Sequence, residues 1–120
     1  FTTGTPWINV NPNYREINAR AAVSDPDSVF HYYQELIRLR HTLPVIVYGK
    51  FEGLLEDSET IYAYRRLLDG QVLTVACNFT DQEQACDLCE DPAATELISN
   101  YKTHKAGTLQ PYEARVILQK

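Results

Sequence analysis

The sequence predicts a mainly β protein, an antiparallel β-sandwich preceded by a loop and one α-helix. A helix-start signal followed by helical periodicity marks residues 25–42, whereas short strand-like runs fill the chain from residue 45 onward. An Asp-Gly turn signal at residues 69–70 separates the two strongest of those runs. One helix followed by roughly six to eight short antiparallel strands is typical of a sandwich with a helical lead-in.

Residues 1–24 are predicted to form a loop, with one helical turn around residues 17–22. Pro and Asn are frequent there, and both disfavour regular structure because Pro lacks an N–H and Asn side chains compete for backbone hydrogen bonds. The loop nevertheless carries Trp7 and Tyr14, which are large aromatic residues. Such residues ordinarily pack against something, so we expect a partner surface for this loop.

Residues 25–42 are predicted to form the helix. Asp25 is a suitable N-cap, and Pro26 stands at the first helical position, where its missing N–H costs nothing. Pro44 is expected to end the helix. Apolar side chains at helical spacing form a broad stripe: Val29, Phe30, Tyr33, Leu36, Ile37 and Leu39.

Strands are expected next at "VIVYG" and "KFEGLLE", and then in a hairpin. Asp69-Gly70 is a favoured two-residue turn, because both residues tolerate the positive φ of a type I′ turn. Both faces of the hairpin are apolar, so we expect it to be central and covered on both sides. The turn fixes two cross-strand pairs: Tyr64 with Val75, and Tyr62 with Cys77.

Shorter strands are expected at "EQACDLC", "ATELISN" and "LQPYEARVILQ". In the first, Cys86 and Leu88 would alternate inward. The last is expected to direct four side chains inward: Tyr112, Ala114, Val116 and Leu118.

The composition is that of an ordinary globular protein. Its 120 residues suffice for one domain with a core, and 44% hydrophobic with 22% charged residues is average. The net charge of −5 argues against nucleic acid as a partner, and no apolar run is long enough to cross a membrane. Three cysteines are an odd number for a disulfide scaffold, so we expect a reducing, cytoplasmic setting.

Neither a metal site nor a cofactor is expected. Cys86 and Cys89 have zinc-like spacing, but no second such pair follows and His104 is isolated. No glycine-rich phosphate loop occurs. Asn78 begins a glycosylation sequon, which matters only in a secreted protein and is discounted here.

No catalytic residue can be assigned. The serines stand in no nucleophile elbow, and His31 with Glu35 has the spacing of a surface pair on a helix. Asp25 and Asp27 are explained by helix capping, while the acidic residues at 56–59 and 90–91 are expected in exposed turns. None of these carboxylates is flanked by residues that would wall a cleft.

Five segments carry a resemblance to a known family: "FTTGTPWINVNPNYREIN", "DPDSVFHYYQELIRLRH", "PVIVYGKFEGLLEDSETIYAYRR", "VACNF" and "LQPYEARV". Together they resemble the C-terminal part of the α-glucosidases in glycoside hydrolase family 13, in the branch with oligo-1,6-glucosidase, dextran glucosidase and trehalose-6-phosphate hydrolase. The resemblance covers essentially the whole chain and is weakest at residues 86–105.

The resemblance implies a longer protein with a catalytic (β/α)₈ barrel and an α-amylase-type C-terminal β-sandwich. Residues 1–42 would be the tail of the barrel, with loop 1–24 leading into the last barrel helix at 25–42. Residues 43–120 would be the sandwich. Trp7 and Tyr14 would then pack against the barrel, near its active-site face.

The family hydrolyses α-1,6 or related glucosidic bonds in oligosaccharides by a retaining mechanism, which the resemblance extends to the longer protein. The family's three catalytic carboxylates lie in segments that no part of this chain matches, so the chain alone is expected to be inactive and stabilising. Asn11, Asn13 and Tyr14 could approach the substrate, although Asn in an "NPN" loop more often caps a turn.

An alternative function is a stand-alone carbohydrate-binding β-sandwich module. It would need exposed aromatic rings in a row, whereas Tyr62, Tyr64 and Tyr112 stand at positions expected to face inward. The expected partners are the catalytic barrel and, through it, an oligosaccharide. The apolar helix stripe also predicts self-association of the chain by itself.

Overall fold

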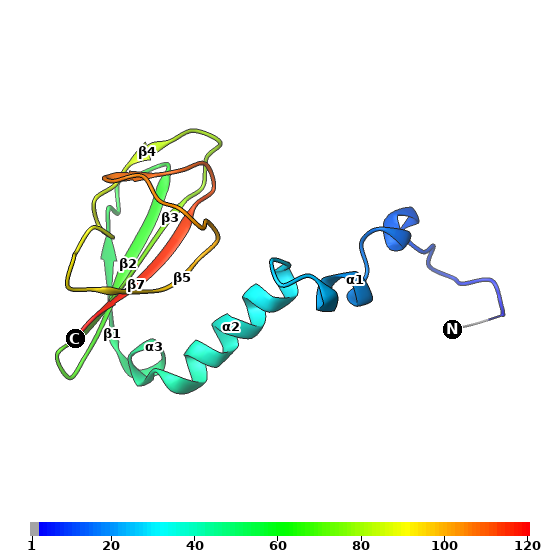
Figure 1. Cartoon of the computed structure of the whole chain (residues 1–120), viewed down its shortest axis with the longest axis horizontal. Helices are drawn as coiled ribbons and strands as arrows, with labels where there is room; N and C mark the ends of the chain where they lie inside the picture. The colour runs from blue at the N-terminus through cyan, green and yellow to red at the C-terminus, as the bar shows by residue number, and fades with distance from the viewer. Residues whose placement is uncertain (1–2) are drawn as a thin grey trace. The chain divides into compact units, whose positions relative to one another are not determined.

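The computed structural model describes residues 3–120 (Figure 1). The chain forms two compact units, Phe1–Glu35 and Leu36–Lys120. Within the described residues, all strands belong to the second unit and they pair only in antiparallel fashion. The predicted mainly β architecture is therefore confirmed.

In the first unit the expected loop contains two short helices, each started by an asparagine. The 3₁₀ helix η1 (Pro12–Arg15) follows Asn11, whose Oδ1 accepts the Asn13 N–H at 3.3 Å. Helix α1 (Ala19–Ser24) follows Asn18, whose Oδ1 accepts a backbone N–H at 3.0 Å. Both side chains satisfy N–H groups that a helix start leaves without intrahelical partners.

Helix α2 (Val29–Thr42) begins four residues later than the sequence predicts. Asp25 does not cap it, because Asp25 closes α1 with its backbone N–H on the Ala21 carbonyl at 3.1 Å. Ser28 stands directly before α2, and its carbonyl accepts the Tyr32 N–H at 3.1 Å. The helix thus starts only after the chain has completed the turn out of α1.

The strand expected at "VIVYG" is wrong, because these residues lie in helix α3 (Pro44–Tyr48). Pro44 starts this helix at the position where its missing N–H costs nothing. Val45 is fully buried in a cluster with Leu73, Val75 and Leu118. Tertiary burial therefore outweighs the β preference of the Val and Ile residues.

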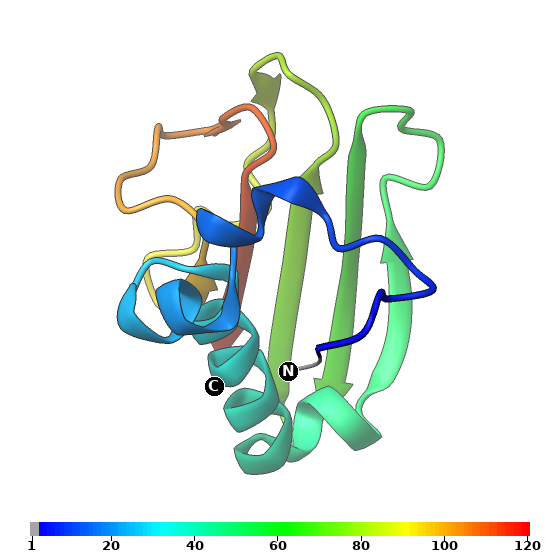
Figure 2. The same cartoon turned by 90° about the vertical axis from the view of Figure 1, so that its right-hand side faces the viewer.

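The main sheet has five strands in the order β1-β2-β3-β7-β5. Figure 2 shows β1, β2, β3 and β7 lying side by side. The strands are β1 (Lys50–Leu54), β2 (Ile61–Leu68), β3 (Gln71–Asn78), β7 (Ala114–Gln119) and β5 (Thr95–Ser99).

The predicted β2–β3 hairpin is confirmed in turn, register and position. Asp69 and Gly70 have φ angles of 47° and 81°, as a type I′ turn requires. The pairs are Tyr64 with Val75 and Tyr62 with Cys77. The hairpin is central, and buried clusters cover both faces: one contains Ile61, Ala63 and Ala76, and the other contains Leu73 and Val75.

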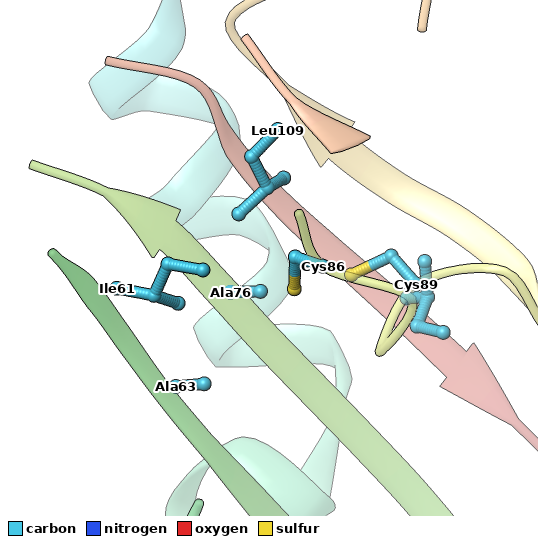
Figure 3. Packing of buried hydrophobic residues seen from close by; sticks show 7 residues of the cluster. Ile61, Ala63, Ala76, Cys86, Cys89 and Leu109 are labelled. Atoms are coloured by element: carbon cyan, nitrogen blue, oxygen red, sulfur yellow. The ribbon is translucent and has the colours of Figure 1, made fainter. Parts of the chain in front are cut away.

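The second layer of the sandwich is small. Its sheet pairs β4 (Gln84–Ala85) with β6 (Thr108–Leu109), and irregular chain supplies the rest. Leu109, Cys86 and Cys89 pack on Ile61, Ala63, Ala76 and Ile117 of the main sheet (Figure 3).

The predicted inward pattern differs from the structure in two details. Cys86 and the partly buried Leu88 pack on the same core cluster, as predicted, but they lie in a turn after β4 rather than on a strand, and Cys89 is buried as well. Tyr112 is 61% exposed and precedes β7 with a φ of 54°. Five other residues of that segment are buried: Leu109, Glu113, Arg115, Ile117 and Leu118.

A network of ion pairs and hydrogen bonds between buried and partly exposed charged side chains connects the irregular segments to β7. The carboxylate of Glu113, which is fully buried, lies 2.5 Å from His104 Nδ1 and accepts the Gln110 N–H at 2.7 Å. His104 Nε2 lies 3.1 Å from Glu96. Arg115 then bonds Glu96 and Glu90 at 3.1 Å each, and the Cys89 carbonyl at 3.3 Å.

Removing the guanidinium of Arg115 should therefore destabilise the fold. Arg115→Met removes the cation that Glu96 and Glu90 share and the donor to the Cys89 carbonyl. Because both carboxylates are about a third exposed, we expect a loss of about 1–3 kcal/mol. Urea unfolding of the chain measures this loss. Lys50→Met is the control, since Lys50 pairs with Glu52 on the surface and should change the unfolding free energy little. Equal effects of both variants would contradict the prediction.

Two glycines give a matched test of the packing around α3. A Cβ on Gly49 would lie 2.4 Å from the Val45 carbonyl oxygen, a backbone atom that cannot move alone. A Cβ on Gly53 would meet only the carboxylate end of Glu56, which can rotate away. Gly49→Ala should lower the free energy of unfolding by about 1–3 kcal/mol, as overpacking does. Gly53→Ala should cost clearly less in the same urea titration, and the reverse order would refute the argument.

Candidate functional site

The three predicted substrate-proximal residues lie together at η1. The side chain of Asn11 is used as the cap described above, and the Asn13 carbonyl accepts the N–H groups of Glu16 and Ile17 at 2.9 Å each. Tyr14 is half exposed, and its hydroxyl accepts a hydrogen bond from Arg15 Nε at 3.3 Å. Among the three, Tyr14 offers a half-exposed aromatic ring, whereas Asn11 positions the turn.

Tyr14 and Arg15 border an open hollow of about 840 Å³. The guanidinium of Arg15 lies over the Tyr14 ring, 5.8 Å from its centroid. The remaining lining comes from residues 18–21 and Ser24, so it contains no carboxylate, imidazole or thiol. This surface can donate hydrogen bonds and stack against a ring, but it holds no group suited to general acid–base catalysis.

A second surface lies on the face of the main sheet that α3 partly covers. An apolar groove of about 220 Å³ runs there between helical residues and strand residues. Leu36 and Leu39 of α2 and Ile46 of α3 form one side. The sheet contributes Tyr64, Leu73, Val75, Ile98 and Val116.

Three aromatic rings form a row beside this groove. Tyr64 lies between Phe51 and Tyr62, with ring-centroid distances of 5.3 Å and 5.7 Å. Phe51 and Tyr62 are 51% and 53% exposed, so the expectation that Tyr62 faces inward is wrong. The position of Tyr62 near the open end of the face, away from α3, explains this exposure. The alternation of the sequence predicts correctly on which face of the sheet Tyr62 lies. It does not predict how far the covering layer extends over that face.

Arg66 of β2 holds α3 against the main sheet beside the groove. Its Nη2 donates to the carbonyls of Val47 at 3.2 Å and Gly49 at 2.9 Å, and its Nε donates to Val45 at 3.3 Å. Carbonyls at the C-terminal end of a helix favour a cation. The Val45 carbonyl also accepts the Gly49 N–H at 3.1 Å. The groove therefore has one rigid wall.

The cysteines have no features of a reactive site. All three are free, and burial raises the pKa of Cys77, of Cys86 and, to about 11, of Cys89. Thiolate, the reactive and metal-binding form, is thus scarce at neutral pH. Within residues 3–120, no group of three or more His, Cys, Asp and Glu side chains is placed to hold a metal ion.

The sequon residue Asn78 is a structural clamp. It is 3% exposed, and its amide donates to the carbonyls of Gln82 at 2.7 Å and Gln110 at 2.9 Å. Its Oδ1 accepts the Thr80 N–H at 2.9 Å. A glycan on this nitrogen would break the clamp. In the described part of the chain, no helix is both long and apolar enough to cross a bilayer.

Two family models match the chain in succession. The model described as "Alpha amylase, catalytic domain" matches residues 1–49. The model described as "Beta-galactosidase C-terminal domain" matches residues 63–119. The first match ends directly after α3, and the second covers most of the sheet.

The similar proteins include oligo-1,6-glucosidases and a trehalose-6-phosphate hydrolase. The chain is 46% identical to an oligo-1,6-glucosidase of Halalkalibacterium halodurans, covering 100% of the chain and 23% of that protein. It is 47% identical to an oligo-1,6-glucosidase of Parageobacillus thermoglucosidasius, covering 97% and 22%. It is 41% identical to the trehalose-6-phosphate hydrolase of Bacillus subtilis, covering 97% and 22%.

Solved structures agree with these relatives. Trehalose-6-phosphate hydrolase of Bacillus licheniformis superimposes with a TM-score of 0.89 at 39% identity, over 99% of the chain and 23% of that enzyme. A trehalulose synthase of Pseudomonas mesoacidophila gives 0.86 at 33% identity, over 100% and 23%. The chain thus spans less than a quarter of the length of the relatives it matches. It belongs to glycoside hydrolase family 13 and corresponds to the C-terminal part of the α-glucosidases in that family.

Proposed function

We propose that the chain is the non-catalytic, stabilising C-terminal part of an α-glucosidase that cleaves α-1,6 or related glucosidic bonds in oligosaccharides. The observation that carries this proposal is the 46–47% identity to oligo-1,6-glucosidases along 97–100% of the chain. Retaining hydrolysis needs two carboxyl groups roughly 5–5.5 Å apart in a cleft. The hollow beside Tyr14 has no carboxylate in its lining, so the chain's contribution is binding and support.

We further propose that residues 1–42 belong to the catalytic part and residues 43–120 to the C-terminal domain. The helix α2 ends at Thr42, and the groove-forming α3 is tied to the sheet by Arg66. A cytoplasmic setting is supported by three cysteines that are all free.

Tyr14 is proposed to contact the substrate, with Asn11 and Asn13 holding the turn that presents it. A half-exposed ring and a neighbouring guanidinium match what a sugar offers, namely a C–H face and hydroxyl acceptors. The Asn11 cap fixes the backbone on which Tyr14 stands. Asn13 and Asn11 are positioning residues in this proposal.

The apolar groove and its aromatic row are proposed to be covered by the catalytic barrel. The α2 residues that line the groove, Leu36 and Leu39, belong to residues 1–42, which are assigned above to the catalytic part and match the catalytic-domain model. Chain from the catalytic part thus already covers part of this face, and the uncovered Phe51 and Tyr62 continue the same surface.

A stand-alone sugar-binding module is the second candidate, because three rings stand in a row. The rings are tilted by 30° and 55° to one another, so they form no flat platform on which a sugar chain could stack. Interdigitation with a partner surface suits tilted rings better. This geometry favours the barrel as the occupant.

The activity proposal is tested with two proteins, the 120-residue chain and the product of the complete gene. Hydrolysis of p-nitrophenyl-α-glucoside and isomaltose is expected only from the longer protein, because the chain lacks a carboxylate pair at its hollow. In the longer protein, Tyr14→Ala should lower kcat/KM on isomaltose about tenfold or more when measured well below the melting temperature of the variant. Tyr112→Ala, which removes another exposed tyrosine, is the control. Turnover by the chain alone would refute the assignment.

Coverage of the aromatic row is tested by Tyr62→Ala in both proteins. Burying such a side chain contributes about 1.5–3 kcal/mol, so the longer protein should lose that much stability. The chain alone should change little, because Tyr62 is already half exposed there. Equal losses in both proteins would exclude the barrel as the cover. Dimers of the chain that dissociate on Tyr62→Ala would assign this face to a second copy instead.

A further inference from the structure

Tyr112 stands at a turn position that ordinarily belongs to glycine or asparagine. Residues 110–113 form a four-residue turn, which the Glu113 N–H closes by donating to the Gln110 carbonyl at 3.0 Å. Pro111 occupies the second position of this turn and Tyr112 the third, where φ is 54°. A positive φ at the third position is typical of type II turns and favours Gly or Asn, because a bulky side chain is strained there. The fold therefore carries backbone strain at an aromatic residue.

Hydrogen bonds hold the strained turn in place from two directions. The Tyr112 N–H donates to the Thr80 carbonyl at 3.0 Å, and the Tyr112 carbonyl accepts the side-chain amide of Asn100 at 2.8 Å. The Pro111 carbonyl accepts the Tyr101 hydroxyl at 2.8 Å. Such bonds over-determine the conformation, so the backbone under the Tyr112 ring is fixed before any partner arrives.

The side chain that this turn presents gains little packing within the chain. Tyr112 is 61% exposed, and Phe79, which directly precedes Thr80, is 69% exposed. Neither ring lines the hollow at Tyr14 or the apolar groove. A strained backbone that keeps a large ring in water lowers the stability of the chain, and such a conflict between sequence and local structure is expected at a functional site. The ring is therefore suited to a contact outside the chain.

The length of the relatives indicates what that contact is. Two oligo-1,6-glucosidases align with 97–100% of the chain, but the chain covers only 22–23% of each, so most of each relative has no counterpart here. Exposed tyrosines on a rigid backbone are effective interface residues, because the ring buries a large area and loses little conformational entropy. We propose that Tyr112 is an anchor that packs into the surface of the catalytic barrel, with Phe79 beside it. This inference rests on the proposed function, since the barrel belongs to the longer α-glucosidase.

The anchor predicts different effects of one substitution in two proteins. Tyr112→Asn introduces a residue that tolerates a positive φ and removes the ring. In the 120-residue chain the melting temperature should stay the same or rise, because the strain is relieved. In the product of the complete gene it should fall by about 2 °C or more, because the buried ring is lost. Tyr112→Phe keeps the ring and the strain, so it should change both proteins equally little, and an equal fall with Tyr112→Asn in both would overturn the proposal.

Nitration of tyrosine by tetranitromethane measures the exposure of the ring directly. Tyr112 should be nitrated in the chain, and this reaction should be lost in the longer protein, because a docked ring is shielded from the reagent. Equal nitration of Tyr112 in both proteins would refute the anchor. Protection in the chain alone that grows with its concentration would assign the ring to a second copy, and protection of the chain by isomaltose would assign it to a sugar. Either result would overturn the barrel as the partner.

Hydrolysis of isomaltose by the unsubstituted longer protein separates this inference from the proposed function. An active longer protein in which Tyr112 is nitrated as readily as in the chain would refute the anchor and leave the α-glucosidase assignment standing. A longer protein that protects Tyr112 but hydrolyses no α-glucoside would refute the assignment and keep the contact between the two parts.

Discussion

The structure depends on one constraint, which is that β3 must be covered on both faces. Leu73 and Val75 point to one side and Ala76 to the other, and all three are buried. A single sheet cannot cover either of its own faces, so each face needs a separate layer packed on it. Helix α3 supplies the first layer through Val45, and the segment around Cys86 and Leu109 supplies the second. The rest of the second unit follows from these two coverings.

The second covering is held mainly by side chains rather than by a strand ladder. Its sheet consists of two-residue strands, so few backbone hydrogen bonds are available to it. Asn78 and Arg115 replace them by bonding the carbonyls of Gln82, Gln110 and Cys89. Buried polar groups with every partner in place make an irregular layer rigid. This arrangement explains why buried polar side chains stand at the end of β3 and near the start of β7.

How far the sequence predicts the structure differs between elements. The β2–β3 register follows from Asp69-Gly70 and strict alternation, both local signals, and it was right. Helix α3 was missed because "PVIVY" has strand-like composition, and only its burial against β3 makes it helical. Tyr14 at η1 was singled out from loop chemistry and stays a prediction, whereas the aromatic row arises from residues on separate strands. Such sites need the pairing of strands, which no local pattern contains.

Arg66 has a consequence for anyone recombining enzymes of this family. The match to the catalytic-domain model ends at residue 49, which suggests a natural crossover point for chimeras. A crossover there would take α3 and Gly49 from one parent enzyme and Arg66 from the other. Three hydrogen bonds from Arg66 to the carbonyls of Val45, Val47 and Gly49 would then span the two parents. Helix α3 is therefore structurally part of the sheet unit, although its sequence matches the catalytic-domain model. Hybrid enzymes joined before Leu43 keep this unit intact. Hybrids joined after Gly49 need an arginine at position 66 in the parent enzyme that supplies the sheet.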